Sequence, residues 1–131
     1  MAIVVDTDIV SYVFKKDTRS KLYERHLIRV PKFISFMPFA ELRRWKFQSY
    51  WGRAKNEKFE EFLSDFGVIY ADEEICNLWA KITSDGLKKG RPVATADAWV
   101  AAVALMFDIS PVTHNRKHFE NIENLKIISE L

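Results

Sequence analysis

The sequence predicts an α/β domain built around a mainly parallel sheet. Short, apolar, β-branched runs alternate along the chain with longer segments whose apolar residues recur at helical spacing. The first run, residues 3–5, is continuously apolar, which is typical of a strand buried on both faces of a parallel sheet. The chain has 131 residues, enough for one domain with its own core, so we expect residues 1–131 to form a single domain.

The predicted strands and helices follow one another in regular order. Strands are expected over residues 3–5, 33–36, 68–70 and 110–113, and residues 125–128 are expected to add an edge strand. Helices are expected over residues 9–14, 22–28, 38–50, 59–66, 75–87 and 96–105. Pro38 suits a first helical turn, and Asp72 and Thr95 suit the N-caps of the last two helices.

Composition and charge exclude several classes of protein. Hydrophobic residues make up 48% of the chain, so intrinsic disorder is excluded. A net charge of +2, from 20 basic and 18 acidic residues, excludes a uniformly basic, histone-like surface. The single Cys76 excludes an internal disulfide framework and a cysteine-rich zinc site. No apolar stretch approaches the roughly 20 residues that cross a bilayer, so we expect a soluble, cytoplasmic protein with no membrane partner.

Polar side chains that can do chemistry follow the predicted strands. Because ligands of such sheets bind beyond the carboxyl ends of the strands, we expect these side chains to converge there. Carboxylates in one cleft repel each other unless a cation joins them, and oxygen ligands without thiolate favour Mg²⁺ or Mn²⁺. The alternative is that each acid only caps a helix or complements its dipole. The side chains are Asp6 and Asp8 after the first strand, Glu41 in the first turn of the helix after the second, Asp97 in the first turn of the alanine-rich helix, and Thr113 and Asn115 after the fourth strand.

The motifs around these acids resemble the PIN-domain ribonucleases, most closely the VapC-type toxins of toxin–antitoxin pairs. They match in order and spacing over essentially the whole chain, and the Ala-Asp-Ala-Trp-Val-Ala-Ala stretch and the Thr-x-Asn-x-x-x-Phe ending are the most specific. The resemblance implies a PIN-like three-layer α/β/α domain with a central sheet of four to five strands. The motifs cover residues 4–10, 39–42, 94–102 and 112–119.

The resemblance also implies a site and a reaction. Asp6, Glu41 and Asp97 correspond to the acidic cluster that holds Mg²⁺ or Mn²⁺, and Asn115 stands at the fourth position, often Asp in the family. Thr7 and Thr113 match the flanking polar residues, and either Asp8 or Asn115 completes the site. A metal-activated water would cleave RNA and leave 5′-phosphate and 3′-hydroxyl ends. The resemblance further implies inhibition by a cognate antitoxin and assembly as a homodimer.

Two surfaces are candidates for contact with these partners. Basic residues near the expected site are candidates for RNA binding, and the alternative is that the charged runs are ordinary solvated helix faces. The candidates are Lys88, Lys89, Arg91, Arg116 and Lys117. The helix over residues 39–51 has more aromatic residues than one buried stripe needs, so either a large aromatic core or an exposed antitoxin-binding patch is expected. The candidates for antitoxin binding are Arg43, Trp45, Phe47, Tyr50 and Trp51.

Other functions compete with the metal-dependent nuclease. A metal-free ribonuclease needs a pair of histidines, and His26, His114 and His118 offer no obvious pair, so the last two are expected at the surface or against substrate. Because Asn115 replaces an acid, a catalytically degenerate RNA- or partner-binding domain is an alternative. A phosphatase of the haloacid dehalogenase type would use Asp6 as its nucleophile and Asp8 as its acid, but the chain lacks that class's later acidic pair.

Overall fold

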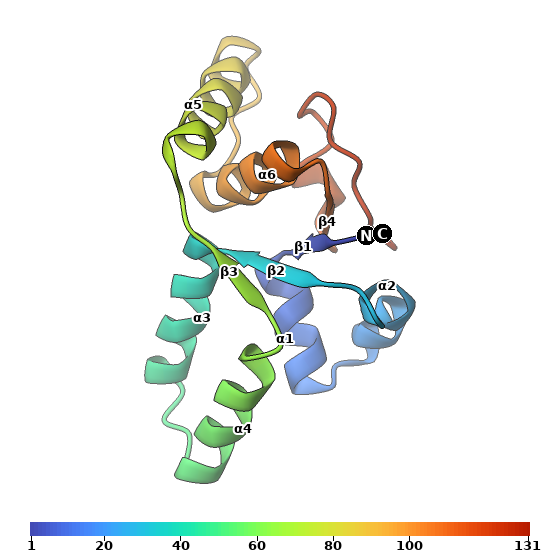
Figure 1. The fold of residues 1–131 in the computed structure, drawn as a ribbon, viewed down its shortest axis with the longest axis vertical. Helices are drawn as coiled ribbons and strands as arrows, with labels where there is room; N and C mark the ends of the chain where they lie inside the picture. The colour runs from blue at the N-terminus through green and yellow to red at the C-terminus, as the bar shows by residue number, and fades with distance from the viewer.

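Four parallel strands form the centre of the molecule, in the order β3-β2-β1-β4 (Figure 1). A computed structural model describes residues 1–131. The two central strands pair with Ile3 opposite Lys32, and Val5 of β1 lies opposite Val112 of β4. The predicted mainly parallel sheet is therefore confirmed. The strands are β1 (Ile3–Val5), β2 (Lys32–Ser35), β3 (Gly67–Ile69) and β4 (Ser110–Val112).

Helices cover both faces of this sheet and make three layers, as predicted (Figure 1). The chain's two termini lie close together at the β4 side of the sheet. No helix combines the length and the apolar character needed to cross a membrane. One face carries α1 (Thr7–Lys15), η1 (Thr18–Leu22), α2 (Glu24–Leu27), α3 (Phe36–Gln48) and α4 (Arg53–Leu63), and the other carries α5 (Glu73–Lys88), α6 (Thr95–Phe107) and the short η2 (Arg116–His118).

Strand alternation divides the apolar core into two clusters. Ile3 and Val5 of β1 face the cluster that includes Phe59 of α4, whereas Val4 between them faces α5 and α6. The alanine-rich α6 packs on β1, β2 and β4, and its Ala98, Ala101 and Ala102 are fully buried. Small side chains let this helix lie close to the sheet, which brings its first turn near the strand ends.

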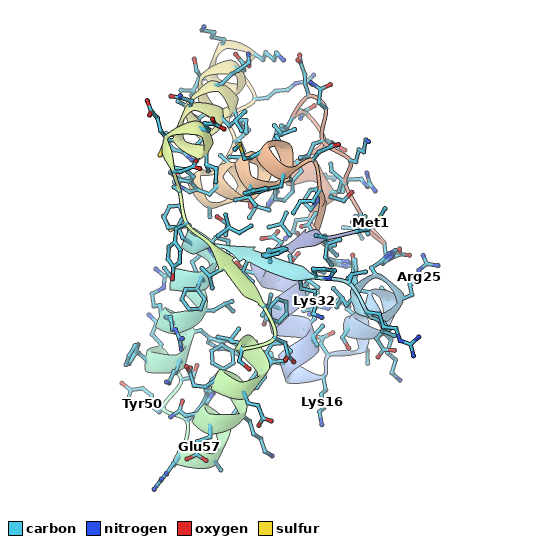
Figure 2. The ribbon with its side chains drawn as sticks, in the orientation of Figure 1. Met1, Lys16, Arg25, Lys32, Tyr50 and Glu57 are labelled. Carbon is cyan, nitrogen blue, oxygen red and sulfur yellow. The ribbon has the colours of Figure 1, made fainter.

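Some aromatic residues of α3 and the following turn lie in the core, and others are exposed. Trp45 and Trp51 are partly buried and pack edge-on against Phe59, with ring centroids 5.4 Å and 5.1 Å away. Phe47 and Tyr50 are 78% and 95% exposed. Figure 2 shows Tyr50 near Glu57 at the end of the α3–α4 arm that is farthest from the sheet. The chain thus has a large aromatic core and also two exposed aromatic side chains.

Several predicted boundaries are wrong for identifiable reasons. Helix α3 begins at Phe36 rather than Pro38, because a proline in the third helical position still removes no hydrogen bond. Glu41 consequently lies in the second turn, not the first. Ala94, not Thr95, is the N-cap of α6, and no side chain caps that end. Asp72 does cap α5, accepting a 2.8 Å hydrogen bond from the Ile75 N–H.

The expected helix over residues 22–28 is shorter than predicted, and the expected edge strand over residues 125–128 is reduced to one bridge. Asp17 caps the short 3₁₀ helix η1, and the four-residue α2 follows it. Near the C-terminus only Ile128 bridges to Val112, since Leu125 and Ile127 pack against the core on the α6 side. The Ile128 N–H donates to the Pro111 carbonyl at 2.9 Å, and its own carbonyl accepts from the Thr113 N–H at 3.1 Å.

Gly86 allows the loop that leads into α6 to pack tightly on α5. A Cβ at this position would lie 2.8 Å from the Arg91 carbonyl oxygen, so the backbone would have to shift to accept it. The Arg91 N–H also donates to the Gly86 carbonyl at 2.8 Å. This contact fixes the start of the segment that carries Asp97.

We expect Gly86→Ala to lower the free energy of unfolding by about 1–3 kcal/mol, since the added methyl group overpacks against backbone. The matched control is Gly52→Ala, where a Cβ meets nothing within 4 Å and the change should stay within about 0.5 kcal/mol. Urea unfolding monitored by circular dichroism measures both values. Equal stability of the two variants would contradict the close approach at Gly86.

Candidate active site

Asp6 lies at the centre of the candidate site, between the end of β1 and the start of α1. Its side chain is the N-cap of α1: Oδ1 accepts from the Thr7 N–H at 2.8 Å. Its Oδ2 accepts from the Thr113 hydroxyl at 2.8 Å, and that threonine is fully buried after β4. Asp6 is itself only 7% exposed. A cap on a surface helix does not need such burial, so capping alone does not explain this aspartate.

Asp8, two residues further on, binds the loop that follows β4. Its Oδ2 accepts from the His114 N–H at 2.9 Å and from the Asn115 side-chain amide at 3.0 Å. Its Oδ1 accepts from the Ile9 N–H at 2.7 Å. The sequence left open whether Asp8 or Asn115 completes the site, and in the structure these two side chains bind each other. Thr7 completes the link to α3, because its hydroxyl donates to Glu41 Oε1 over a long 3.5 Å contact.

Asp97 joins this group from the first turn of α6, and the carboxylates act on one another's charge. Burial raises the pKa of Asp6 to about 6, with further increases from the negative charges of Asp8 and Glu41. Burial, then the charge of Asp6, raises the pKa of Asp97 to about 6, against a lowering effect of His118. Burial likewise raises the pKa of Asp8. The site therefore carries more negative charge than its surroundings balance.

This donor set fits a hydrated hard cation. No three Asp, Glu, His or Cys side chains are arranged to hold a metal ion by themselves. Mg²⁺, however, keeps several waters and is commonly bound through one or two carboxylates. Asp6 and Asp97 supply carboxylate oxygens, and Glu41 is near enough to raise the pKa of both. A divalent cation with its waters would balance the excess negative charge.

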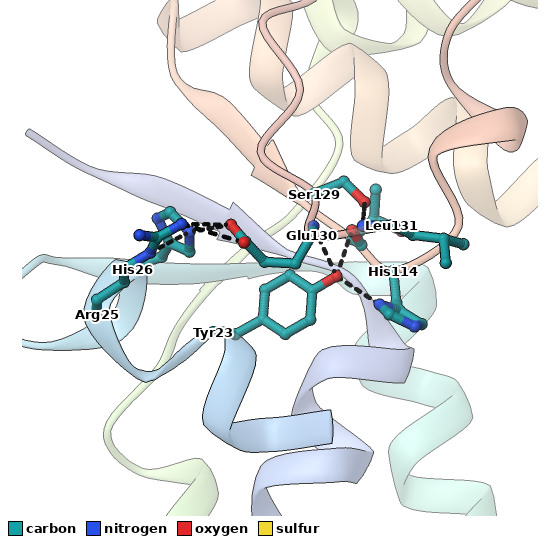
Figure 3. A network of polar contacts seen from close by, with 8 residues as sticks. Tyr23, Arg25, His26, His114, Ser129, Glu130 and Leu131 are labelled. Carbon is teal, nitrogen blue, oxygen red and sulfur yellow. Dashed lines mark hydrogen bonds and ion pairs between the residues drawn. The ribbon is translucent and has the colours of Figure 1, made fainter. Parts of the chain in front are cut away.

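A buried tyrosine holds the loop of residues 113–115 from behind. The Tyr23 hydroxyl lies 2.6 Å from His114 Nδ1 and accepts from the Glu130 N–H at 3.1 Å (Figure 3). It also lies 3.4 Å from the Thr113 carbonyl. The Glu130 carboxylate in turn pairs with Arg25 at 2.9 Å and His26 at 2.8 Å. The C-terminal segment is thus tied to the same loop that binds Asp6 and Asp8.

Three residues near the site were not assigned their positions from the sequence. His118 is exposed, as expected, and its Nδ1 lies 3.2 Å from Asp97 Oδ2, a contact that the sequence did not predict. Tyr23 was treated only as an apolar helix residue. Ser35 is fully buried at the end of β2, and its hydroxyl has no hydrogen-bond partner. A serine inside a predicted strand, three residues before a proline, was the available signal for Ser35.

The basic candidates separate into two groups. Arg91 and Lys117 line a cavity of about 300 Å³ that Asp97, His118 and Asn121 also line. Arg91 donates to the Asn121 side-chain oxygen at 2.8 Å, so no acid neutralises it there. Lys88, Lys89 and Arg116 do not line this cavity, and Lys89 pairs with Glu123 at 3.2 Å.

The antitoxin candidates also differ in their surroundings. Arg43 forms an ion pair with Glu60 and stacks over the Phe39 ring at 4.8 Å. Trp45 and Trp51 are engaged in the aromatic core described above. Phe47 and Tyr50 are the exposed members of the set.

Replacing Tyr23 with Phe tests the support behind the loop. The change removes the hydroxyl and leaves His114 and the Glu130 N–H without their partner, so we expect the free energy of unfolding to fall by about 1–3 kcal/mol. Tyr70→Phe is the control, because Tyr70 is exposed and its hydroxyl makes no hydrogen bond. Chemical denaturation compares the two variants. A Tyr23→Phe protein as stable as the control would contradict the role of this hydroxyl.

The raised pKa of Asp97 predicts that replacing this carboxylate with a neutral side chain stabilises the fold, by an amount that depends on pH. In EDTA the folded chain holds this carboxyl proton more tightly than the unfolded chain, so wild-type stability falls as pH rises through about 6. Asp97→Asn removes that loss. We expect the variant to melt above wild type at pH 7.5 and the difference to shrink towards pH 4, with thermal unfolding as the measurement. Asp85→Asn, on an exposed α5 pair, should show no such gain; a lower melting temperature for Asp97→Asn at pH 7.5 would contradict the prediction.

Comparison with known proteins identifies the family. The family model described as PIN domain matches residues 3–125. Ribonuclease VapC1 of Haemophilus influenzae strain R2866 is 32% identical over 130 residues, and the match covers 96% of each chain.

Solved structures give the same answer. The VapBC-1 structure from nontypeable Haemophilus influenzae superposes with a TM-score of 0.84 at 30% identity, over 98% of both chains. VapBC-5 from Mycobacterium tuberculosis, described as a member of the VapBC family of toxin-antitoxin systems, gives a TM-score of 0.74 over 98% of both chains. At 23% identity this second match supports the fold alone. The family match, the relatives and the shared fold agree with the sequence motifs: the chain belongs to the PIN domain family.

Proposed function

We propose that this chain is a VapC-like endoribonuclease that hydrolyses RNA with the help of Mg²⁺ or Mn²⁺. The observation that carries the proposal is that Asp6, Glu41 and Asp97 come together at the carboxyl end of the sheet, where the charge of Asp6 raises the pKa of Asp97 and the charge of Glu41 raises the pKa of both. A related protein named Ribonuclease VapC1 aligns over 96% of the chain. We further propose that residues 1–131 work as one nuclease domain.

Each side chain of the proposed site has a distinct role. Asp6 and Asp97 would hold the cation, and Glu41 would contact it through water. A bound divalent cation lowers the pKa of a coordinated water and offsets charge that grows on the phosphoryl oxygens. The Thr113 hydroxyl orients the Asp6 carboxylate, and Asp8 fixes the backbone of the neighbouring loop. Attack by water opposite the departing 3′ oxygen leaves a 5′-phosphate and a 3′-hydroxyl.

The cavity next to Asp97 gives the RNA backbone a place to lie. Arg91 and Lys117 supply positive charge in its wall, and their attraction for phosphate carries no sequence information. We assign Lys88, Lys89 and Arg116 a weaker, longer-range contribution, since they lie outside that cavity. These contacts favour a single-stranded or looped RNA whose backbone can reach the acidic group.

A cognate antitoxin is the protein partner we propose. Contiguous exposed apolar patches usually mark contact surfaces, and we propose that Phe47 and Tyr50, exposed three residues apart on the α3–α4 arm, belong to one. Arg43, Trp45 and Trp51 are held by contacts within the chain, so we assign them a smaller part in antitoxin binding. We also propose a homodimer and a cytoplasmic location, where the exposed Cys76 would stay reduced.

The competing interpretations are weaker on the geometry of the site. A phosphatase of the haloacid dehalogenase type would need a later acidic pair at the site, and the residues that follow β4 are Thr113, His114 and Asn115. A catalytically degenerate RNA-binding domain remains the alternative. Asn115 stands where the family often has an acid, and its side-chain amide donates a hydrogen bond to Asp8.

Cleavage of a mixed pool of small RNAs by the purified chain, free of antitoxin, tests the proposal. We expect cutting in Mg²⁺ or Mn²⁺, none in EDTA, and fragments that a 5′-phosphate-dependent exonuclease degrades. Asp6→Asn and Asp97→Asn should each lose about 100-fold or more, since even groups that only orient metal ligands cost 10–100-fold. Asp85→Asn is the matched control and should keep full activity.

Each contrary outcome has a distinct meaning. Cutting that persists in EDTA or in both site variants would overturn the assigned site. A folded wild-type chain that binds RNA without cutting it would favour the degenerate domain.

A further inference from the structure

Ser35 is a buried polar group that the site described above does not yet use. It is the last residue of β2 and the N-cap of α3. The side chain is 0% exposed, and its hydroxyl has no hydrogen-bond partner. A buried hydroxyl in this state destabilises the fold unless something satisfies it.

The local sequence explains why this serine does not cap its own helix. An N-cap serine normally accepts a hydrogen bond from the N–H of the second or third helical residue. The third residue of α3 is Pro38, which has no N–H, and the Ser35 side chain makes no capping bond. One of the two usual partners is thus missing, and the hydroxyl makes no bond to the other, the Met37 N–H, so it stays available to another group.

Strand geometry places Ser35 beside Asp6. Val4 lies opposite Phe33 in the parallel pairing of β1 and β2, and the same register continued by two residues brings Asp6 next to Ser35. Ile34 packs into the cluster on the α1 side, so alternation turns Ser35 to the opposite face. Val4 faces that side too, and Asp6 follows it at the same alternation.

Helix α6 covers this face of the sheet. It packs on both β1 and β2, and its first turn carries Asp97. The unpartnered hydroxyl therefore lies on the same face as the two carboxylates proposed to hold the cation.

We propose that Ser35 is a further residue of the cation site, where its hydroxyl holds a water molecule of the cation's hydration shell beside Asp6. The proposal rests on the proposed function, because it needs a divalent cation between Asp6 and Asp97. A serine hydroxyl both donates and accepts hydrogen bonds, which suits a water that is shared with a carboxylate. Mg²⁺ keeps several of its waters when it binds protein, so such a water is available.

This role gives Ser35→Ala a signature that a purely structural serine would not have. In EDTA the variant should melt at or above the wild-type temperature, because an unsatisfied hydroxyl has been removed. In Mg²⁺ it should gain less than wild type, and its apparent affinity for Mg²⁺ should fall by about 10-fold. Thermal unfolding of the full chain, free of antitoxin, over a series of Mg²⁺ concentrations measures all three values.

Two further variants complete the experiment. Ser35→Cys leaves no cavity, because the thiol is slightly larger than the hydroxyl, but it offers only a weak hydrogen-bonding group, so it should lose Mg²⁺ affinity even if the alanine variant folds poorly. Ser49→Ala removes a hydroxyl that donates to the Trp45 carbonyl at 2.7 Å and should keep the full response to Mg²⁺.

The outcomes separate this proposal from the one on which it rests. If wild type is stabilised by Mg²⁺ and the Ser35 variants respond equally, the role of Ser35 is overturned and the nuclease proposal stands. If wild type itself shows no response to Mg²⁺, both proposals fail. A reduced response in both Ser35 variants, with Ser49→Ala unchanged, supports the assignment.

Discussion

The hydrogen bond from the Thr113 hydroxyl to the Asp6 carboxylate joins the ends of two neighbouring strands, and the site depends on it. β1 and β4 are adjacent and parallel, so the residues that follow them meet at one edge of the sheet. Asp8 repeats the connection by binding the backbone of His114. The segments after the two strands therefore behave as one structural unit, and a shift of either strand would move both aspartates.

Charge at this edge opposes the stability of the fold. Two carboxyl groups whose pKa values rise to about 6 are ionised at neutral pH only at the expense of the folded state. The remainder of the molecule offsets this cost with two apolar clusters, one on each face of the sheet, and with the polar contacts of Tyr23. A cation bound to these carboxylates would stabilise the folded state, because it would bind the folded chain and not the unfolded one.

Much of the fold and of the acidic group was predictable, because both follow from local patterns. Apolar runs located the four strands, and the first turn of α6 was correctly expected to carry Asp97. Glu41 was placed one turn too early, because Pro38 is tolerated anywhere in the first turn and so marks a helix start only loosely. The contacts of Tyr23 with His114 and of His118 with Asp97 were missed, since they join segments whose approach no local pattern encodes.

The contacts of the C-terminal segment make the site dependent on residues that are distant from the acids in the sequence. The loop after β4 is closed by the Ile128 carbonyl, and Tyr23 behind it is bound by the Glu130 N–H. Proteolytic removal of residues 128–131 would leave Asp6, Glu41 and Asp97 in the chain, yet the Thr113 N–H and the Tyr23 hydroxyl would each lose a partner. Trimming of this segment would therefore loosen the loop that holds Asp6 and Asp8 without removing any of the three acids.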